Sequence, residues 1–164
     1  MVTESKKIIK MSVRNLVEFV LRSGDLDNRR SAGAVKTAMQ EGSRIHRKIQ
    51  RRMGSDYRAE VTLKHRVEED QFEILVEGRA DGIIEKPSGI TIDEIKGIYM
   101  DLQYLTEPVE VHLAQAMCYG YFYCYDNGLN GAVLQMTYCN IETEEIKRFQ
   151  VENTFEELED WFNS

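Results

Sequence analysis

Residues 57–67, YRAEVTLKHRV, alternate apolar and polar side chains, as the two faces of a half-buried β-strand require. The alternation resumes in residues 72–84, FEILVEGRADGII, and in residues 90–97, ITIDEIKG. Because only short polar turns separate the three segments, they predict three consecutive antiparallel strands. Asp81 stands between two glycines in the middle segment, which predicts a bulge or a close backbone approach at that point.

Helical patterns surround these strands. Upstream, apolar residues recur every three or four positions as far as Met53, and downstream a tyrosine-rich apolar segment follows Pro108. The sequence TFEE at residues 154–157 is a capping box that begins an acidic helix. The expected helices are residues 13–22, 35–53, 108–125 and one from Thr154, with further strands at 132–139 and 146–151. This order predicts one α+β domain over residues 1–164, with a mixed central sheet flanked by helices.

The charge is unevenly distributed along the chain. The 21 basic and 28 acidic residues give a formal net charge of −7, which alone would disfavour a nucleic-acid binder. Residues 29–66, however, contain eleven basic and three acidic residues, whereas residues 142–160 contain eight acidic and two basic ones. A local basic surface can attract phosphate despite the acidic average, because salt screens charges beyond about 8–10 Å. A solvated helix face is the alternative interpretation.

The composition also excludes several classes of protein. The chain has no run of about 18 apolar residues that would predict a membrane-spanning helix, and residues 1–11 lack the apolar core of a signal peptide. The three cysteines, Cys118, Cys124 and Cys139, have no CxxC spacing, so we expect neither a disulfide framework nor a zinc ribbon. We therefore expect a cytoplasmic protein without a membrane partner.

Two acidic residues and a lysine form the constellation that points to chemistry. On a strand Glu94 and Lys96 share one face, and a hairpin would bring Asp81 close to Glu94. Carboxylate oxygens are the ligands that Mg²⁺ prefers, and a neighbouring lysine can orient an attacking water or offset phosphate charge. An ordinary surface ion pair between Glu94 and Lys96 is the alternative. Glu60 is expected at a solvated strand edge, with a further acidic group near the metal as the alternative. His112 is expected in the core or at the surface of its helix, with a position bordering the substrate groove as the alternative.

The spacing of these residues resembles the signature of the PD-(D/E)XK nucleases. Asp81 is followed thirteen residues later by Glu94-Ile95-Lys96, and the contexts GRADG and IDEIKG are most similar to the RecB-like exonuclease branch. The resemblance implies a restriction-endonuclease-like αβββαβ core. It also implies that Asp81 and Glu94 bind a divalent metal, with the carbonyl of Ile95 as a further ligand, and that Lys96 is the catalytic lysine.

Two further motifs of that branch are present. A Gly-x-x-x-His motif ends at His46, and a Gln-x-x-x-Tyr motif joins Gln115 to Tyr119. By resemblance, His46 is a metal ligand, and Gln115 and Tyr119 line the DNA groove. A core histidine and a helix packed by its tyrosines are the alternatives from the residues alone.

The beginning of the chain carries a narrower likeness. Residues 11–29 and 41–50 resemble the N-terminal nuclease region of bacterial XPD/DinG-type helicases. The resemblance implies that the chain is a nuclease-like domain from a longer protein, with a helicase domain as its partner. Relatives in the RecB-like branch often hold an iron–sulfur cluster through four cysteines. The three cysteines here have neither that number nor those positions, so no cluster is expected.

These observations together predict a Mg²⁺- or Mn²⁺-dependent deoxyribonuclease, an exonuclease by resemblance, that acts in DNA repair or processing. Arg44, Arg47 and Lys48, on the basic face of the helix that carries His46, are candidates for contact with the DNA backbone. One alternative is a nuclease-like module that binds DNA for an attached helicase without cutting it. The other is a protein-interaction domain that uses the acidic C-terminal helix.

Overall fold

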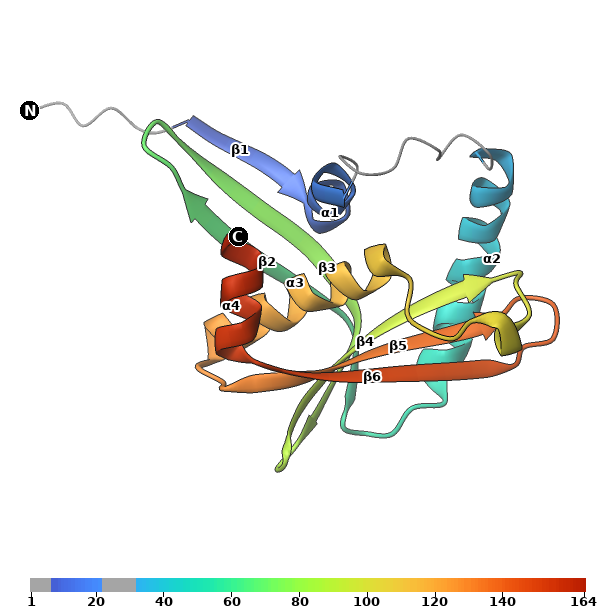
Figure 1. The fold of residues 1–164 in the computed structure, drawn as a ribbon. Helices are drawn as coiled ribbons and strands as arrows, with labels where there is room; N and C mark the ends of the chain where they lie inside the picture. Colours follow the sequence, from blue (N-terminus) through green and yellow to red (C-terminus); the bar gives the residue numbers. More distant parts are fainter. Residues whose placement is uncertain (1–6, 22–31) are drawn as a thin grey trace, which may run out of the picture.

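A six-stranded mixed sheet with helices packed against it forms the part of the chain that the computed structural model describes, residues 7–21 and 32–164 (Figure 1). The strands are β1 Lys7–Ser12, β2 Tyr57–Glu68, β3 Phe72–Lys86, β4 Gly89–Ile98, β5 Gly131–Asn140 and β6 Ile146–Thr154. The helices are α1 Val13–Leu21, α2 Ala32–Arg51, α3 Glu110–Asn127 and α4 Phe155–Asn163, with a short 3-10 helix at Leu102–Tyr104. The α+β class and the mixed sheet are therefore confirmed.

Strand β3 changes one of its neighbours halfway along. On one side it pairs antiparallel with β2 over most of its length. On the other side its first half, up to Glu77, pairs in parallel with β1, and its second half, from Gly82, pairs antiparallel with β4. Asp81 lies between these two halves, where β1 and β4 separate. Beyond β4, helix α3 crosses over to the parallel strand β5, and β6 pairs antiparallel with β5.

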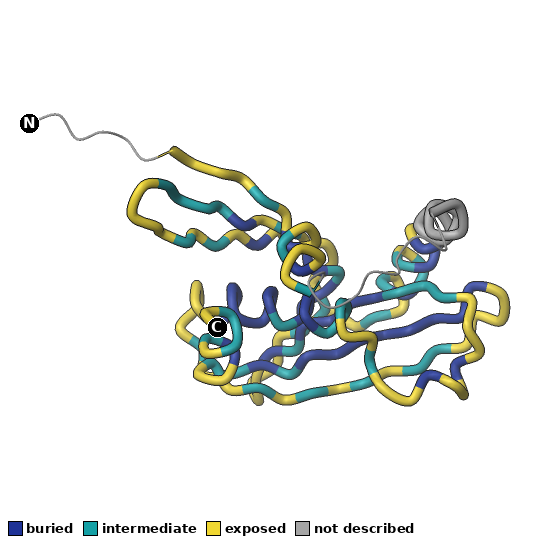
Figure 2. The backbone as a smooth tube through the Cα atoms, turned by 45° about the horizontal axis from the view of Figure 1, so that its top comes forward, coloured by how far each residue is buried: buried dark blue, intermediate teal, exposed yellow. Residues whose placement is uncertain are grey.

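Helices α2 and α3 pack on opposite faces of β4. Because successive side chains of a strand point to opposite faces, Ile92 joins the core beneath α3, whereas Ile95 packs with Ile45 and Ile49 of α2. In Figure 2 the buried residues gather where α3 crosses the strands, while the far end of the layer formed by β1, β2 and β3 is largely exposed. The two helices thus enclose the segment of β4 that carries the Glu-x-Lys triplet.

The three predicted antiparallel strands are confirmed, but two details differ from expectation. Strand β1 was not predicted, because almost all of its residues are exposed and it carries no apolar alternation. The predicted bulge at Asp81 is wrong. The pairs on either side of it, Ala59–Gly82 and Val61–Ala80, keep a single register, so no residue is inserted.

The predicted close approach around Asp81 is confirmed, and it explains both glycines. A Cβ atom on Gly78 would lie 2.8 Å from the ring of Tyr119, and one on Gly82 would lie 1.9 Å from the ring of Tyr57. A side chain at either position would push an aromatic ring away. The glycines therefore let two tyrosines pack directly against β3.

The helices form where the sequence predicts them, with ends that differ by up to three residues. Helix α2 spans Ala32–Arg51 against an expected 35–53, and α3 ends at Asn127 against an expected 125. Helix α3 begins at Glu110 with Val109 as its N-cap, so the expected start at Pro108 is wrong by two residues. The capping box at Thr154 is confirmed, because its side chain and that of Glu157 each accept a backbone N–H of the other residue. No helix within the described ranges is long and apolar enough to cross a membrane.

Candidate metal and catalytic centre

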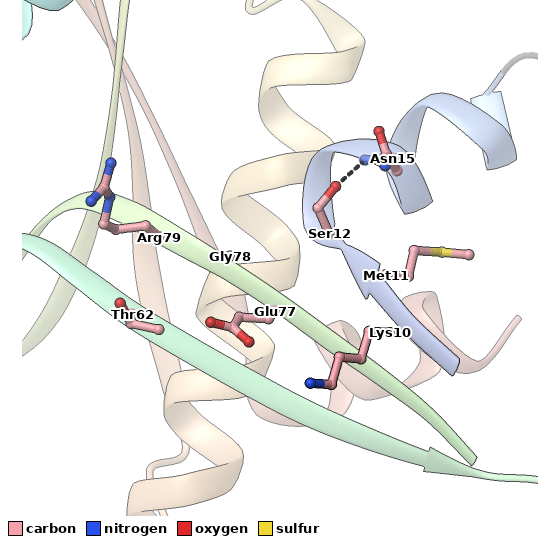
Figure 3. Close-up of a pocket in the computed structure, with 8 residues that line it drawn as sticks. All are labelled: Lys10, Met11, Ser12, Asn15, Thr62, Glu77, Gly78 and Arg79. Carbon is pink, nitrogen blue, oxygen red and sulfur yellow. Dashed lines mark hydrogen bonds between the residues drawn. The ribbon is translucent and has the colours of Figure 1, made fainter. Parts of the chain in front are cut away.

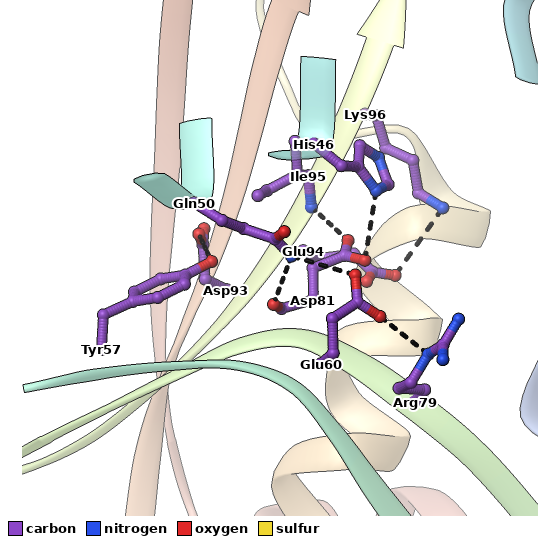
Figure 4. Close-up of polar contacts among 10 residues, drawn as sticks. All are labelled: His46, Gln50, Tyr57, Glu60, Arg79, Asp81, Asp93, Glu94, Ile95 and Lys96. Carbon is purple, nitrogen blue, oxygen red and sulfur yellow. Dashed lines mark hydrogen bonds and ion pairs between the residues drawn. The ribbon is translucent and has the colours of Figure 1, made fainter. Parts of the chain in front are cut away.

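The carboxylate of Asp81 lies where the pairing of β3 with β4 ends, next to the part of β4 that follows Asp93 (Figure 4). Its Oδ2 accepts a hydrogen bond of 2.7 Å from the backbone N–H of Ile95, in place of a strand carbonyl. Its Oδ1 lies 3.4 Å from Nδ1 of His46 on α2. One side chain, 13% exposed, therefore connects β3, β4 and α2.

Glu94 and Lys96 share the α3 face of β4, as predicted, with Nζ of Lys96 3.7 Å from Oε2 of Glu94. Burial raises the pKa of Glu94 well above its usual value, the negative charge of Asp81 raises it further, and the Lys96 ammonium lowers it. The Glu94 side chain is 4% exposed and lies next to Asp81. The pair is thus not an ordinary surface ion pair. Two carboxyl groups held together in this way retain a proton or need a cation.

The four predicted metal ligands meet around Asp81, but they do not form a closed ligand set. Asp81 contacts His46 and Glu94 directly, and it is bonded to the backbone of Ile95. Within residues 7–21 and 32–164, no three His, Cys, Asp or Glu side chains form a group that could hold a metal ion. The donor chemistry, two carboxylates with one imidazole and one carbonyl, suits Mg²⁺ or Mn²⁺. Binding would require these side chains to turn toward one point.

Gln115 and Tyr119 lie one turn apart on the buried side of α3. Oε1 of Gln115 is buried and has no hydrogen-bond partner in the described part of the chain, which is uncommon in folded proteins. Tyr119 packs against Gly78, and burial raises its pKa, with further increases from the charges of Glu94 and Asp81. This side of α3 therefore faces the carboxyl pair. Tyr119 is 7% exposed and packs against β3 from the side of the sheet that α3 covers.

Nearby acidic residues neutralise much of the positive charge in the basic stretch, residues 29–66. Lys48 donates a hydrogen bond of 2.6 Å to Glu144 in the turn between β5 and β6. Ion pairs across β2 and β3 join Arg58 to Glu85, Lys64 to Glu77 and Arg66 to Glu73. Arg44 and Arg47 are exposed on α2. The first two basic residues of the stretch lie outside the described residues.

Gln50 and Arg79, which the sequence did not assign to the centre, lie near Asp81 together with Glu60. Nε2 of Gln50 donates to the Asp81 carbonyl at 2.9 Å and to Oε1 of Glu60 at 3.2 Å. Glu60 also pairs with Arg79 at 2.7 Å, and its φ of 59° lies in the left-handed region, which costs energy for a residue with a side chain. The solvated strand edge expected for Glu60 is confirmed, because its side chain is 41% exposed and β2 pairs only with β3 among the described strands. The same side chain nevertheless lies beside Asp81 through Gln50. The hairpin register, which puts residue 60 opposite residue 81, is the signal that could have predicted this proximity.

A second buried carboxylate lies on the opposite face of β4 and has a different environment. Asp93 is 1% exposed and accepts hydrogen bonds from Tyr57 at 2.8 Å, Gln135 at 3.1 Å and Thr137 at 2.6 Å. Burial raises the pKa of Tyr57, and the neighbouring Asp93 raises it further. Three neutral donors thus satisfy Asp93, whereas the neighbours of Glu94 are Asp81 and Lys96. This difference makes Asp93 a structural residue and Glu94 a candidate ligand.

A groove of about 530 Å³ adjoins this centre between β1, the start of α1 and the β2–β3 pair (Figure 3). Lys10 and Arg79 contribute positive charge to its lining, and Glu77 contributes negative charge. One of its lining residues, Arg79, also pairs with Glu60, which lies near Asp81. Its mixed charge alone does not select a ligand.

No family model and no curated protein matches this chain. Among solved structures, the crystal structure of SSO0001 resembles it with a TM-score of 0.60 and 18% sequence identity, over 93% of this chain and 70% of that one. At this identity the likeness shows a shared fold and carries no information about activity.

Proposed function

We propose that this protein is a Mg²⁺- or Mn²⁺-dependent deoxyribonuclease of the PD-(D/E)XK type, which hydrolyses phosphodiester bonds as an exonuclease in DNA repair or processing. The observation that carries the proposal is the pairing of two carboxyl groups, Asp81 and buried Glu94, beside Lys96. An uncompensated carboxylate pair is costly to bury, and a divalent cation offsets that cost while supplying chemistry.

The proposal gives each residue of the centre a role. Asp81, Glu94, His46 and the carbonyl of Ile95 would hold the metal, which when bound polarises a phosphodiester and stabilises the departing oxygen. Lys96, held by Glu94, would orient the attacking water and offset charge on the phosphate.

Gln115, one turn from Tyr119 on α3, is a candidate contact for a ligand at this centre. Its buried Oε1 lacks a partner, and leaving such an acceptor unsatisfied costs about 1–3 kcal/mol. If Gln115 turned toward the centre, a bound nucleotide that donates to Oε1 would remove that cost. Arg44, Arg47 and Lys48 on α2 would add contacts to backbone phosphates, with the Lys48–Glu144 ion pair opening to free the lysine.

The test is a cleavage assay on labelled single- and double-stranded DNA with Mg²⁺ or Mn²⁺. We expect Glu94→Gln and Lys96→Gln to lose cleavage by a factor of about 10² or more while thermal melting shows a folded protein. The chain offers a matched control in Glu145→Gln, because Glu145-Ile146-Lys147 has the same spacing and its glutamate is exposed. Cleavage that persists in both site variants would sink the assignment.

One observation favours a second candidate, a nuclease-like module that binds DNA for a helicase without cutting it. The expected ligands do not form a closed set among the described residues. Calorimetric titration with Mn²⁺, on the wild type and on Asp81→Asn, separates the two candidates. Metal binding that Asp81→Asn abolishes favours the nuclease, whereas DNA binding without any metal binding favours the module.

The proposal also covers the cellular location, the partner and the substrate of the protein. The three cysteines are free and buried, which suits a reducing cytoplasm. A helicase domain of the same polypeptide is the proposed partner, and DNA strands or ends are the proposed substrate.

A further inference from the structure

His112 lies on α3 one turn before Gln115, and a hydrogen bond to a buried tyrosine fixes its ring. Nδ1 of His112 is 2.8 Å from the hydroxyl of Tyr138, and the two ring centroids are 5.5 Å apart. The same hydroxyl accepts the backbone N–H of Val109 at 2.9 Å. The position of the imidazole proton follows from these two contacts.

The Tyr138 hydroxyl has one proton, and that proton needs an acceptor. Tyr138 is 0% exposed, so water cannot reach its hydroxyl. If Nδ1 of His112 donated to Tyr138, the hydroxyl proton would be buried without a partner, at a cost of about 1–3 kcal/mol. Tyr138 therefore donates to Nδ1, and neutral His112 carries its own proton on Nε2.

His112 remains neutral at physiological pH. Burial, and then the positive charge of Lys96, lower its pKa to about 3. Protonation would also remove the lone pair that Nδ1 uses to accept the Tyr138 hydroxyl. The ring is therefore held as a donor through Nε2–H.

This donor lies beside the proposed catalytic lysine. Tyr138 pairs with Lys96 in the register of β4 and β5, so His112, which is bonded to Tyr138, faces the side of the sheet that carries Lys96. His112 is partly exposed, and the described residues offer no hydrogen-bond partner to Nε2. A neutral N–H next to an ammonium group is complementary to an anionic oxygen.

We propose that His112 binds a phosphate oxygen of the nucleic-acid strand through Nε2–H, in the tautomer that Tyr138 imposes. The inference rests on the proposed function, because it takes a phosphodiester as the ligand. It adds a substrate-binding residue that is uncharged and whose ring is held in place by a hydrogen bond with a buried tyrosine.

The test measures binding of a short labelled single-stranded DNA in Ca²⁺ in place of Mg²⁺, so that cleavage does not interfere. We expect His112→Ala to weaken binding by about tenfold to a hundredfold, as the loss of one hydrogen bond to a charged group should. His112→Gln, whose amide can still donate, should recover most of that loss. His65→Gln is the matched histidine control, because His65 packs against Phe122 and Phe162 toward the other end of α3.

Salt dependence separates a neutral donor from a structural or charged residue. His112→Ala should leave the slope of log Kd against log salt unchanged, whereas Lys96→Gln should reduce it by about 0.7 for a single-stranded ligand. Two-bond proton–nitrogen correlations should show His112 protonated on Nε2 in the wild type and a mixture of tautomers in Tyr138→Phe. Thermal melting confirms that each variant is folded.

Each outcome bears on the inference. Equal affinity of the wild type and His112→Ala, an equal loss in the Ala and Gln variants, or a proton on Nδ1 overturns it, and so does a wild type that binds no DNA. A wild type that binds DNA through His112 but never cleaves it contradicts the proposed nuclease activity alone.

Discussion

The carboxylate of Asp81 accepts the backbone N–H of Ile95 at 2.7 Å, where the pairing of β3 with β4 has just ended. Backbone pairing stops at Gly82 and Asp93, so the Asp81 side chain supplies the acceptor that the missing strand partner would have supplied. The same carboxylate faces His46, and its charge raises the pKa of Glu94. Asp81 thus both connects the two strands and carries part of the charge of the proposed centre. Different substitutions of this residue should therefore affect the stability of the protein and its activity to different degrees.

Asp81→Ala and Asp81→Asn should differ in stability but not in activity. Alanine leaves the N–H of buried Ile95 without an acceptor, which costs about 1–3 kcal/mol. Asparagine can still accept that hydrogen bond and removes the like charge beside Glu94, so its unfolding free energy should match or exceed that of the wild type. Denaturant titration and the cleavage assay measure the two effects. Equal stability of the two variants would show that the Asp81–Ile95 bond does not contribute.

The sequence predicted the parts of the fold that depend on local pattern. Alternation over residues 57–67 and the capping box at Thr154 indicate elements that form where expected. Strand β1 depends instead on its parallel pairing with residues 72–77 of β3, a contact between distant segments. Because β1 is exposed along its length, no apolar period marks it, and only the folded sheet reveals it.

The candidate centre likewise has one part that local sequence patterns predict and another part that they do not. The sequence predicts that Asp81 lies close to Glu94, because short turns indicate which neighbouring strands pair. The contribution of Glu60 depends on a left-handed backbone and on Gln50 from a separate helix, and sequence spacing encodes neither. The tautomer of His112 depends on Tyr138, 26 positions away, and on the burial of that hydroxyl.

Glu94→Gln should stabilise the metal-free protein, and increasingly so as pH rises. The pKa of Glu94 is raised in the folded state above its usual value of 4.5, so the folded state binds the proton more tightly than the unfolded state. The free energy of unfolding therefore falls as pH rises from about 4.5 through the folded pKa, and glutamine removes that loss.

Thermal melts in EDTA at several pH values check this prediction. A change of about 1 kcal/mol moves the Tm of a domain of this size by about 2–4 °C, so a difference of that order between wild type and variant is measurable. Glu145→Gln, at an exposed glutamate, should show no such trend. A gap between Glu94→Gln and wild type that narrows toward high pH would contradict the raised pKa.

Metal binding should release a proton. In the metal-free protein the raised pKa of Glu94 favours its protonated form, and Glu94 must lose that proton before it can act as a ligand. Below the pKa of Glu94, the affinity for Mn²⁺ should therefore increase by about tenfold per pH unit. Calorimetry in two buffers of different ionisation enthalpy counts the protons released. Binding with no dependence on buffer or pH would place the ion away from Glu94.

Alanine should have opposite effects at two glycines. In Gly82→Ala the added Cβ would lie 1.9 Å from the ring of Tyr57 and displace its hydroxyl from buried Asp93, so we expect a loss of about 3 kcal/mol or more. In Gly42→Ala on α2 no atom of the described residues lies within 4 Å of the added Cβ, and we expect a gain of about 0.5–1 kcal/mol. Denaturant titration measures both, and the background Tyr57→Ala tests the cause. If displacement of the ring is the reason, Gly82→Ala should cost much less in that background, whereas an unchanged cost would point to the backbone of β3 instead.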